Sequence, residues 1–395
     1  MVGRNCEFVP VRLSAAAYAG MFGFGIVMAL LGALLPVLAR RLQFDLSHAG
    51  DLFLVMNAAM LVTSLALGPL VDRFGHKAPL VIAPLFVAGA LGLISRVMTF
   101  EGLVTALIFL GIGGGALNQV TNTLIADLYE DVRKKRAELN ILGIFFGFGA
   151  LFVPFAVGSL LTHLGLAKIL YLALALSLIP AVLSIPLVFP APQQREGVPL
   201  AEVVRLARQP LVLTFAFLLF FESGNEFILG GYITTYLTRD LQASLSLASY
   251  LLAAYWGALM LGRLVVSRLT LHKSAGSVIW ASALAVAGST ILLLTVRLMS
   301  IAAIAIILLG VSITTIFPTV LGLAGSSFAR HSGTVFGILI GIALAGGMTL
   351  PWVVGKIAAG WGIRAGLSLV VLNALAVFGF QLLANTILRR KKIRI

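Results

Sequence analysis

Twelve long apolar runs dominate this chain and limit its fold more than any other feature. They are separated by charged residues, Pro and Gly, and they lie near 14–39, 51–71, 79–98, 102–125, 139–162, 168–189, 211–237, 246–267, 275–296, 301–327, 333–357 and 364–387. About 20 consecutive apolar residues suffice for a helix to cross the hydrocarbon core of a bilayer. Lipid offers no hydrogen bonds to backbone groups, so such runs cross as α-helices. The sequence predicts an all-α membrane protein with twelve transmembrane helices.

The composition excludes an ordinary soluble domain. The chain is 60% hydrophobic and only 11% charged, whereas a soluble domain is about 45–50% apolar and about 25% charged. Its net charge of +14 does not indicate nucleic acid as a partner, because the Lys and Arg residues lie between apolar runs. The single cysteine, Cys6, permits neither an intrachain disulfide nor a cysteine metal cage. No metal and no cofactor are expected.

The distribution of basic residues predicts the orientation. With both termini in the cytoplasm, the inner loops, tails and helix ends carry twenty of the 28 Lys and Arg residues, among them the cluster at 133–136 and the tail at 389–394. This bias follows the positive-inside rule. The N-terminus lacks a cleavage pattern, so the first run is expected to be retained as a span. We expect a multi-pass protein of a cell membrane, such as a bacterial inner membrane, in contact with the lipid bilayer and monomeric.

An internal repeat divides the chain into two halves. A polar, Pro-containing stretch at 191–210 is expected to be a cytoplasmic linker between six-helix bundles at 1–190 and 211–395. Three pairs of segments recur in order at offsets of 194, 199 and 197: LGPLV at 67–71 with LGRLV at 261–265, Leu110-Gly111 with Leu309-Gly310, and Gly149-x4-Pro154 with Gly346-x4-Pro351. A parallel repeat of this kind predicts a solute site between the two bundles near the bilayer midplane. Such an arrangement suits alternating access.

One loop motif is specific enough to indicate a family. Residues 68–77 fit the pattern G-x3-D-[RK]-x-G-x-[RK], which resembles the cytoplasmic loop signature of the major facilitator superfamily. The resemblance implies the major facilitator fold and a gating role for Gly68, Asp72, Arg73, Gly75 and Lys77, with Asp127 and Arg136 in the matching element after the fourth run. The corresponding loop of the second half has Val266 or Ser267 in place of the Asp.

Several further segments resemble the fucose/galactose/glucose–proton symporter branch. They are LNQVTNTLIADLY at 117–129, LNILGIFFGFGALFVP at 139–154, GNEFILGGYITTYL at 224–237, IFPTVLGLAG at 316–325 and the stretch 332–362. The branch's fucose symporters carry an Asp in the first span and a Glu in the fourth. Here the first span has no carboxylate, Asn118 stands at the second position, and Gly143 stands where relatives often have His. The proton-coupling residues of the branch therefore cannot be carried over.

Two glutamates provide another candidate for coupling. Glu222 and Glu226 lie deep in the seventh run and, being four apart, share one helical face at about 6 Å. Carboxylates inside a membrane are costly and usually mark a function. Two neighbouring ones do not ionise together easily, so at least one is expected to hold a proton. The structural alternative is a neutral Glu that hydrogen-bonds between helices. Gly224, Gly230 and Gly231 predict a local break in the same helix.

Amide and aromatic side chains are candidates for solute contact. Amides donate and accept as sugar hydroxyls do, and an aromatic face can pack on a sugar ring, although helix packing is the alternative for each of these residues. The candidates are Asn118, Gln119, Asn122, Asn225, Asn57, Trp256 and Trp352. We expect no Lys or Arg at mid-depth, whereas an organic acid or phosphate ester would need a buried positive partner. A neutral polyol or a cation is therefore favoured.

These features favour a secondary active transporter over an enzyme. We expect a small neutral solute, most favourably a hexose-type sugar, to be moved with protons or another cation. The alternatives are proton-driven export of cationic or amphipathic compounds, an uncoupled facilitator, and a receptor derived from the fold. No nucleophile–base or metal cluster is evident, since the five His residues fall near loops or helix ends.

Overall fold

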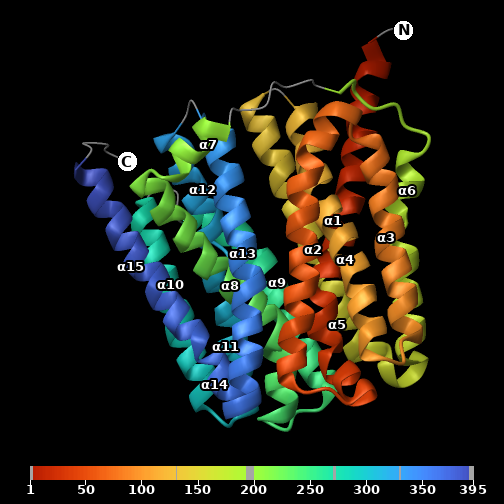
Figure 1. Ribbon diagram of the computed structural model, residues 1–395, viewed down its shortest axis with the longest axis vertical. Helices are drawn as coiled ribbons and strands as arrows, with labels where there is room; N and C mark the ends of the chain where they lie inside the picture. Colours follow the sequence, from red (N-terminus) through yellow and green to blue (C-terminus); the bar gives the residue numbers. More distant parts are fainter. Residues whose placement is uncertain (1–2, 130, 193–199, 270–272, 329–330, 391–395) are drawn as a thin grey trace. The chain divides into compact units, whose positions relative to one another are not determined.

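The structure is a computed structural model that describes residues 3–129, 131–192, 200–269, 273–328 and 331–390 (Figure 1). Within these ranges the side chains of 3–10, 72, 132–133, 136, 200, 264–269 and 332 are outside the description. The regular elements of the described residues are all helices: α1 Gly3–Leu42, α2 Leu46–Phe74, α3 Lys77–Arg96, α4 Phe100–Leu128, α5 Val132–Ser177, α6 Ile179–Ser184, α7 Leu200–Ala207, α8 Pro210–Arg239, α9 Leu245–Leu269, α10 Ala275–Thr295, α11 Met299–Ile313, α12 Ile316–Ser327, α13 Ser332–Trp361, α14 Ile363–Leu367 and α15 Leu369–Arg390.

Eleven stretches of the described residues are long and apolar enough to cross a membrane. One of them, Ala137–Ser184, has 48 residues. A straight helix of that length would extend about 70 Å, more than twice the thickness of a hydrocarbon core of about 30 Å. It is interrupted at Gly165, whose φ of 74° and ψ of 163° are not helical. This stretch therefore contains two crossings, which correspond to the predicted runs 139–162 and 168–189. The all-α membrane architecture is confirmed.

The helices form two compact units. The first unit consists of residues 1–44, 55–195 and 245–253, and the second consists of 45–54, 196–244 and 254–395. The described part of the stretch predicted as a linker, 191–210, contains α7, and its linker role stays a prediction. The exchanged segments, 45–54 and 245–253, begin α2 and α9 and are 200 residues apart. This separation is close to the offset of the sequence repeat.

The repeated Gly-x4-Pro motif corresponds to the closest helix contact in each unit that we describe. In the first unit α1 packs on α5, and a Cβ added at Gly149 would lie 1.9 Å from the backbone oxygen of Phe22. In the second unit α8 packs on α13, and a Cβ added at Gly346 would lie 2.0 Å from the backbone oxygen of Phe220. Only glycine allows two backbones to approach this closely. The repeat therefore specifies the same helix pairing twice.

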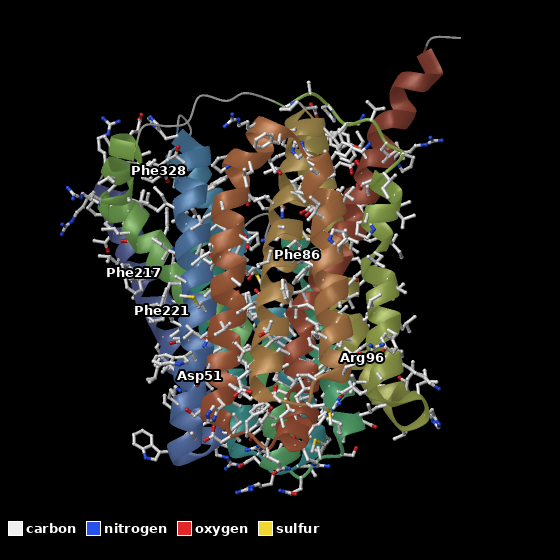
Figure 2. The ribbon with its side chains drawn as sticks, turned by 45° about the vertical axis from the view of Figure 1, so that its right-hand side comes forward. Asp51, Phe86, Arg96, Phe217, Phe221 and Phe328 are labelled. Carbon is white, nitrogen blue, oxygen red and sulfur yellow. The ribbon has the colours of Figure 1, made fainter. Side chains whose placement is uncertain are left out.

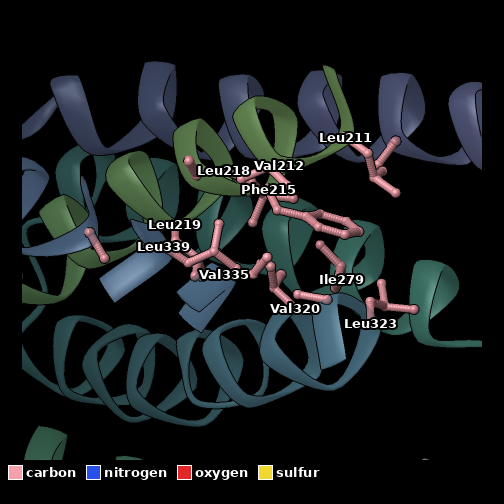
Figure 3. Packing of buried hydrophobic residues seen from close by; sticks show 14 of the residues in the cluster. Leu211, Val212, Phe215, Leu218, Leu219, Ile279, Val320, Leu323, Val335 and Leu339 are labelled. Carbon is pink, nitrogen blue, oxygen red and sulfur yellow. The ribbon is translucent and has the colours of Figure 1, made fainter. Parts of the chain in front are cut away.

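An apolar core fixes one end of α8 in the second unit (Figure 3). Leu211, Phe215 and Leu219 on α8 are almost fully buried. They pack in one cluster with residues of α10, α12 and α13, including Ile279, Val320, Leu323, Val335 and Leu339. This cluster holds the helix that carries both membrane-embedded glutamates.

The predicted break in α8 is wrong, and the tenth run is broken instead. α8 is one continuous helix over Pro210–Arg239. Its glycines serve close packing, since a Cβ at Gly224 would lie 2.1 Å from Leu350 and one at Gly230 would lie 2.7 Å from Trp256. The tenth run, predicted as a single helix over 301–327, divides into α11 and α12. Pro318 explains this division, because it has no N–H to donate to the carbonyl four residues earlier.

Candidate functional site

The two glutamates of α8 occupy different environments within the second unit. Glu222 is 1% exposed, whereas Glu226 is partly exposed. Both carboxyl oxygens of Glu222 are buried and have no hydrogen-bond partner among the described residues. A buried polar group without a hydrogen bond costs about 1–3 kcal/mol in proteins, and an isolated charge costs far more. Glu222 therefore does not have the contacts of a glutamate that serves as a hydrogen-bonded link between helices.

The surroundings of Glu222 are dry and aliphatic. Its carboxyl faces a gap that is too narrow to hold a water molecule. Asn225 is its one other polar lining residue, and the remaining lining residues come from α10, α11, α12 and α15: Ala283, Val286, Ile313, Ile316, Ala374 and Val377. These side chains cannot solvate a charge, so the gap favours the neutral, protonated form of the carboxyl group.

The charge of Arg263 acts on both glutamates, which the sequence analysis missed because it expected no Lys or Arg at mid-depth. Its position near the end of the eighth run suggests a place close to the membrane surface. In the structure its positive charge lies close enough to interact with both Glu222 and Glu226. The long apolar stem of an arginine allows its charged group to lie far from its own Cα. The buried Tyr255, also on α9, lies within range of the same three charges. When all three groups are ionised, the cluster carries one net negative charge.

Asn225 and Trp256 lie beside this cluster and make specific packing contacts. The Asn225 Nδ2 atom donates to the backbone oxygen of Val370 at 3.3 Å, and its Oδ1 atom accepts from Asn373 at 2.9 Å. Trp256 is 1% exposed and packs edge to face against Tyr255, with ring centroids 5.3 Å apart. Their roles in solute contact stay predictions, and both residues hold helices of the second unit together.

Trp352 belongs to a separate polar cluster of the second unit. Its indole Nε1 donates to Asp51 Oδ1 at 2.9 Å, and Lys356 Nζ lies 2.8 Å from the same oxygen. Asp51 is labelled in Figure 2. Lys356 also donates to Ser47 at 2.8 Å. These contacts dock the first turns of α2 on α13. The sequence analysis did not predict Asp51 as a partner of Trp352.

The predicted amide face of α4 lies in the first unit. Asn118, Gln119 and Asn122 are all partly exposed, and Asn122 Nδ2 donates to the backbone oxygen of Asn118 at 2.8 Å and to its Oδ1 at 3.1 Å. A Cβ added at Gly68 would lie 3.9 Å from Gln119 Nε2, so this amide faces α2. Asn57, also on α2, is 3% exposed. The partial exposure of the three α4 amides leaves them able to contact a solute.

The loop motif forms a tight turn between α2 and α3. Gly75 has a φ of 81°, which disfavours residues with a side chain. Lys77 Nζ donates to the backbone oxygen of Leu187 at 3.0 Å, and the Arg73 guanidinium lies 5.3 Å from the centre of the Phe74 ring. The side chains of Asp72 and Arg136 lie outside the described residues. The gating role of these residues stays a prediction.

Asp127, the remaining residue assigned to the gate, pairs with a histidine that the sequence analysis left in a loop. Asp127 Oδ2 and His76 Nε2 are 3.4 Å apart, and both side chains are at most 10% exposed. This buried contact links the end of α4 to the α2–α3 turn. In the described part of the chain, no group of three or more His, Cys, Asp or Glu side chains is arranged to hold a metal ion.

Comparisons with known proteins place these features in a family. The profile of the Major Facilitator Superfamily matches residues 17–351. A sodium-dependent glucose transporter 1 of Rattus norvegicus is 29% identical over 153 residues, which are 39% of this chain and 31% of that protein. The 4-hydroxybenzoate transporter PcaK of Pseudomonas aeruginosa is 29% identical over 183 residues, or 46% of this chain and 40% of the relative. The chain thus matches less than half the length of either curated relative.

Solved structures with the same fold cover nearly the whole chain. The nucleoside transporter NupG has a TM-score of 0.77 at 15% identity and covers 96% of this chain and 99% of its own. A bacterial homologue of the lysosomal transporter Spinster, in an inward-facing and unoccupied conformation, has a TM-score of 0.74 at 13% identity, with 98% of each chain covered. The fucose:proton symporter FucP of E. coli has a TM-score of 0.66 at 17% identity over 95% of this chain and 99% of its own. At these identities the likeness shows the fold.

Proposed function

The chain belongs to the Major Facilitator Superfamily, and from this membership we propose that it moves a small neutral solute, most favourably a hexose-type sugar, by alternating access coupled to protons. The family and its structural neighbours identify a multi-pass membrane transporter and not an enzyme. The neighbours carry sugars, nucleosides and an aromatic acid, so the family alone leaves the solute open.

The observation that carries the coupling proposal is the state of Glu222. Glu222 is a membrane-embedded carboxyl group that is 1% exposed and has no hydrogen-bond partner among the described residues. No hydrogen bond therefore compensates for the cost of its desolvation. Proton exchange supplies a reason for its presence. Glu226 lies one turn further along α8 and is partly exposed. Loading of a proton and a solute would permit the transition between outward- and inward-open states.

The sugar proposal is supported by side-chain chemistry. The partly exposed amides of α4 offer paired donors and acceptors that suit hydroxyl groups. The similarity to a glucose transporter points the same way. We further propose that both termini face the cytoplasm, because this orientation places twenty of the 28 basic residues inside.

Uptake into proteoliposomes tests the proposal. Labelled glucose, galactose, mannose and fucose are offered with and without an inward proton gradient, in sodium-free and sodium-containing buffer, to the wild type and to Glu226→Gln and Glu222→Gln. Glu101→Gln is the matched control, since Glu101 is an exposed glutamate in the first turn of α4. We expect the gradient to stimulate uptake of one hexose in the wild type and the control, and to have no effect on Glu222→Gln.

Other results select the alternatives. Hexose exchange that ignores the gradient would make the protein a facilitator. Hexose uptake that requires sodium would replace the proton by a metal cation. The absence of hexose flux under every gradient would reject the sugar, and labelled 4-hydroxybenzoate, a nucleoside and an amphipathic cation, offered in the same assay, would then identify the solute class or an exporter.

A further inference from the structure

The buried cluster on α8 and α9 is one positive charge short of neutrality. Glu222 and Glu226 contribute two negative charges and Arg263 one positive charge, and each lies within range of the others. Tyr255 is buried beside them. In the described part of the second unit the other charged residues lie near helix ends or in loops, among them Glu202, Arg205, His331, Lys356, Arg364, Arg389 and Arg390. Two further titratable side chains, Tyr232 and Tyr236, are buried on α8 itself. A net charge in a desolvated site is costly, so the cluster is stable when it takes up one further positive charge.

From this charge balance we propose that Arg263 limits the glutamate pair to a single exchangeable proton, and that this proton resides on Glu222. The inference rests on the proposed function, since it specifies how many protons move with each solute and where they bind. Arg263 acts as a positioning residue: it keeps Glu226 ionised by charge pairing and leaves one carboxylate to be neutralised. Without it, both carboxylates would need a proton.

The surroundings of the two carboxyl groups decide which one is protonated. The gap beside Glu222 is lined by aliphatic side chains and Asn225, and the two carboxyl oxygens of Glu222 have no hydrogen-bond partner in the described part of the chain. Glu226 is partly exposed, so its carboxylate is less desolvated than that of Glu222, which is 1% exposed. An ionised carboxylate is therefore tolerated at Glu226 and not at Glu222.

The gap beside Glu222 suits a proton better than a metal cation. Hard cations require several oxygen ligands. The gap is too narrow for a water molecule. The amide oxygen of Asn225, which also lines the gap, already accepts a hydrogen bond from Asn373. A proton needs only the carboxylate itself. In the loading step an O–H bond forms on one Glu222 oxygen with a proton from the outer solution, and in the release step the same bond breaks and the proton leaves to the inner solution.

The accumulation of solute at steady state measures how many protons move with each solute molecule. With the membrane potential clamped at zero, one proton per neutral solute permits at most about tenfold accumulation for each unit of pH gradient, and two protons permit about a hundredfold. We expect a tenfold slope for the wild type, for Glu101→Gln and for Arg263→Lys, which keeps the charge. Glu222→Gln should retain solute counterflow with no dependence on the gradient.

The Arg263 variants separate a charge effect from a merely structural one. Arg263→Gln should steepen the slope toward a hundredfold, because two carboxylates then require protons. Combination of Arg263→Gln with Glu226→Gln should restore the tenfold slope, since Glu222 is again the single unneutralised charge. A tenfold slope in Glu222→Gln, or an unchanged tenfold slope in Arg263→Gln, would overturn the proposal. If Arg263→Gln does not fold, the double variant is measured in its place. A slope other than tenfold in the double variant would also overturn the proposal.

A measurement without solute distinguishes failure of this inference from failure of the proposed function. Infrared difference spectra of the purified protein report the carbonyl stretch of a protonated carboxylic acid that lacks hydrogen bonds. We expect this band in the wild type, in Glu101→Gln and in the double variant Arg263→Gln/Glu226→Gln, in which Glu222 is the single unneutralised charge, and its loss in Glu222→Gln. A band that persists in Glu222→Gln would place the proton on the other carboxyl group, even if no solute had been identified.

Discussion

The contact between α8 and α13 permits a quantitative test of the packing that holds the glutamates. A Cβ at Gly346 would lie 2.0 Å from the backbone oxygen of Phe220, whereas real Cβ atoms essentially never approach closer than 3.0 Å. Gly346→Ala therefore forces the two backbones apart by about 1 Å. The displaced atom belongs to the helix turn that immediately precedes Glu222 and Glu226.

The expected cost follows from this geometry. Overpacking of a close-packed contact costs about 1–3 kcal/mol, and the upper part of this range applies here because the clash is with backbone and no side-chain rotation relieves it. Alanine gains up to about 1 kcal/mol over glycine in a helix. The net loss of stability for Gly346→Ala is therefore about 1–2 kcal/mol. Gly341 lies on the same helix, and a Cβ added there has no atom within 4 Å. Gly341→Ala should therefore show only the stabilisation of up to about 1 kcal/mol that alanine gives in a helix.

Thermal unfolding in detergent, followed by tryptophan fluorescence, measures the difference. Gly346→Ala should unfold at a lower temperature than the wild type, and Gly341→Ala at an equal or higher one. Gly149→Ala should behave like Gly346→Ala, because its Cβ would lie 1.9 Å from the Phe22 oxygen in the equivalent contact of the first unit. If Gly346→Ala unfolded at or above the temperature of Gly341→Ala, the backbone approach described here would be refuted.

Three further substitutions test polar contacts by the same unfolding assay. Asn373→Ala should cost about 1–3 kcal/mol, because the buried Asn225 Oδ1 loses its donor; a cost below 0.5 kcal/mol would contradict this contact. Asp127→Asn should destabilise the protein by about 1–3 kcal/mol through its buried partner His76, and additivity with His76→Gln would argue that the two do not interact. Thr99→Ala should cost about 1 kcal/mol, since its hydroxyl accepts from Gly102 N at 3.1 Å and caps α4; Thr99→Ser, which keeps the hydroxyl, should cost clearly less.

The membrane crossings of the described residues and their helical conformation were predictable because the bilayer imposes one length on every apolar run. Even the boundary between runs 139–162 and 168–189 was placed correctly, since Gly165 interrupts the helix there. The predicted break in α8 failed for a physical reason. A helical glycine can serve close packing as well as flexibility, and Gly224 and Gly230 pack against Leu350 and Trp256.

The composition of the glutamate site was only half predictable. Glu222 and Glu226 stand out because carboxylates are rare in apolar runs, but Arg263 does not, because sequence position gives the depth of a Cα and not the reach of a long side chain. The hydrogen-bond and charge partners of the polar residues were not predictable either, because they depend on which helices pack against each other. The contacts of Asp127 with His76 and of Trp352 with Asp51 join residues that the sequence separates by 51 and 301 positions.

The charge of the glutamate cluster also bears on the solute. With one proton on Glu222, the cluster is neutral and exerts no net attraction on an anion. Arg263 would become available to a carboxylate solute only after Glu226 was also neutralised, so transport of an aromatic acid through this cluster requires two protons per solute. A neutral sugar requires one. A tenfold slope for each unit of pH gradient therefore supports a neutral solute as well as a single proton, and a cotransport of two protons would shift the proposal from sugars to organic acids.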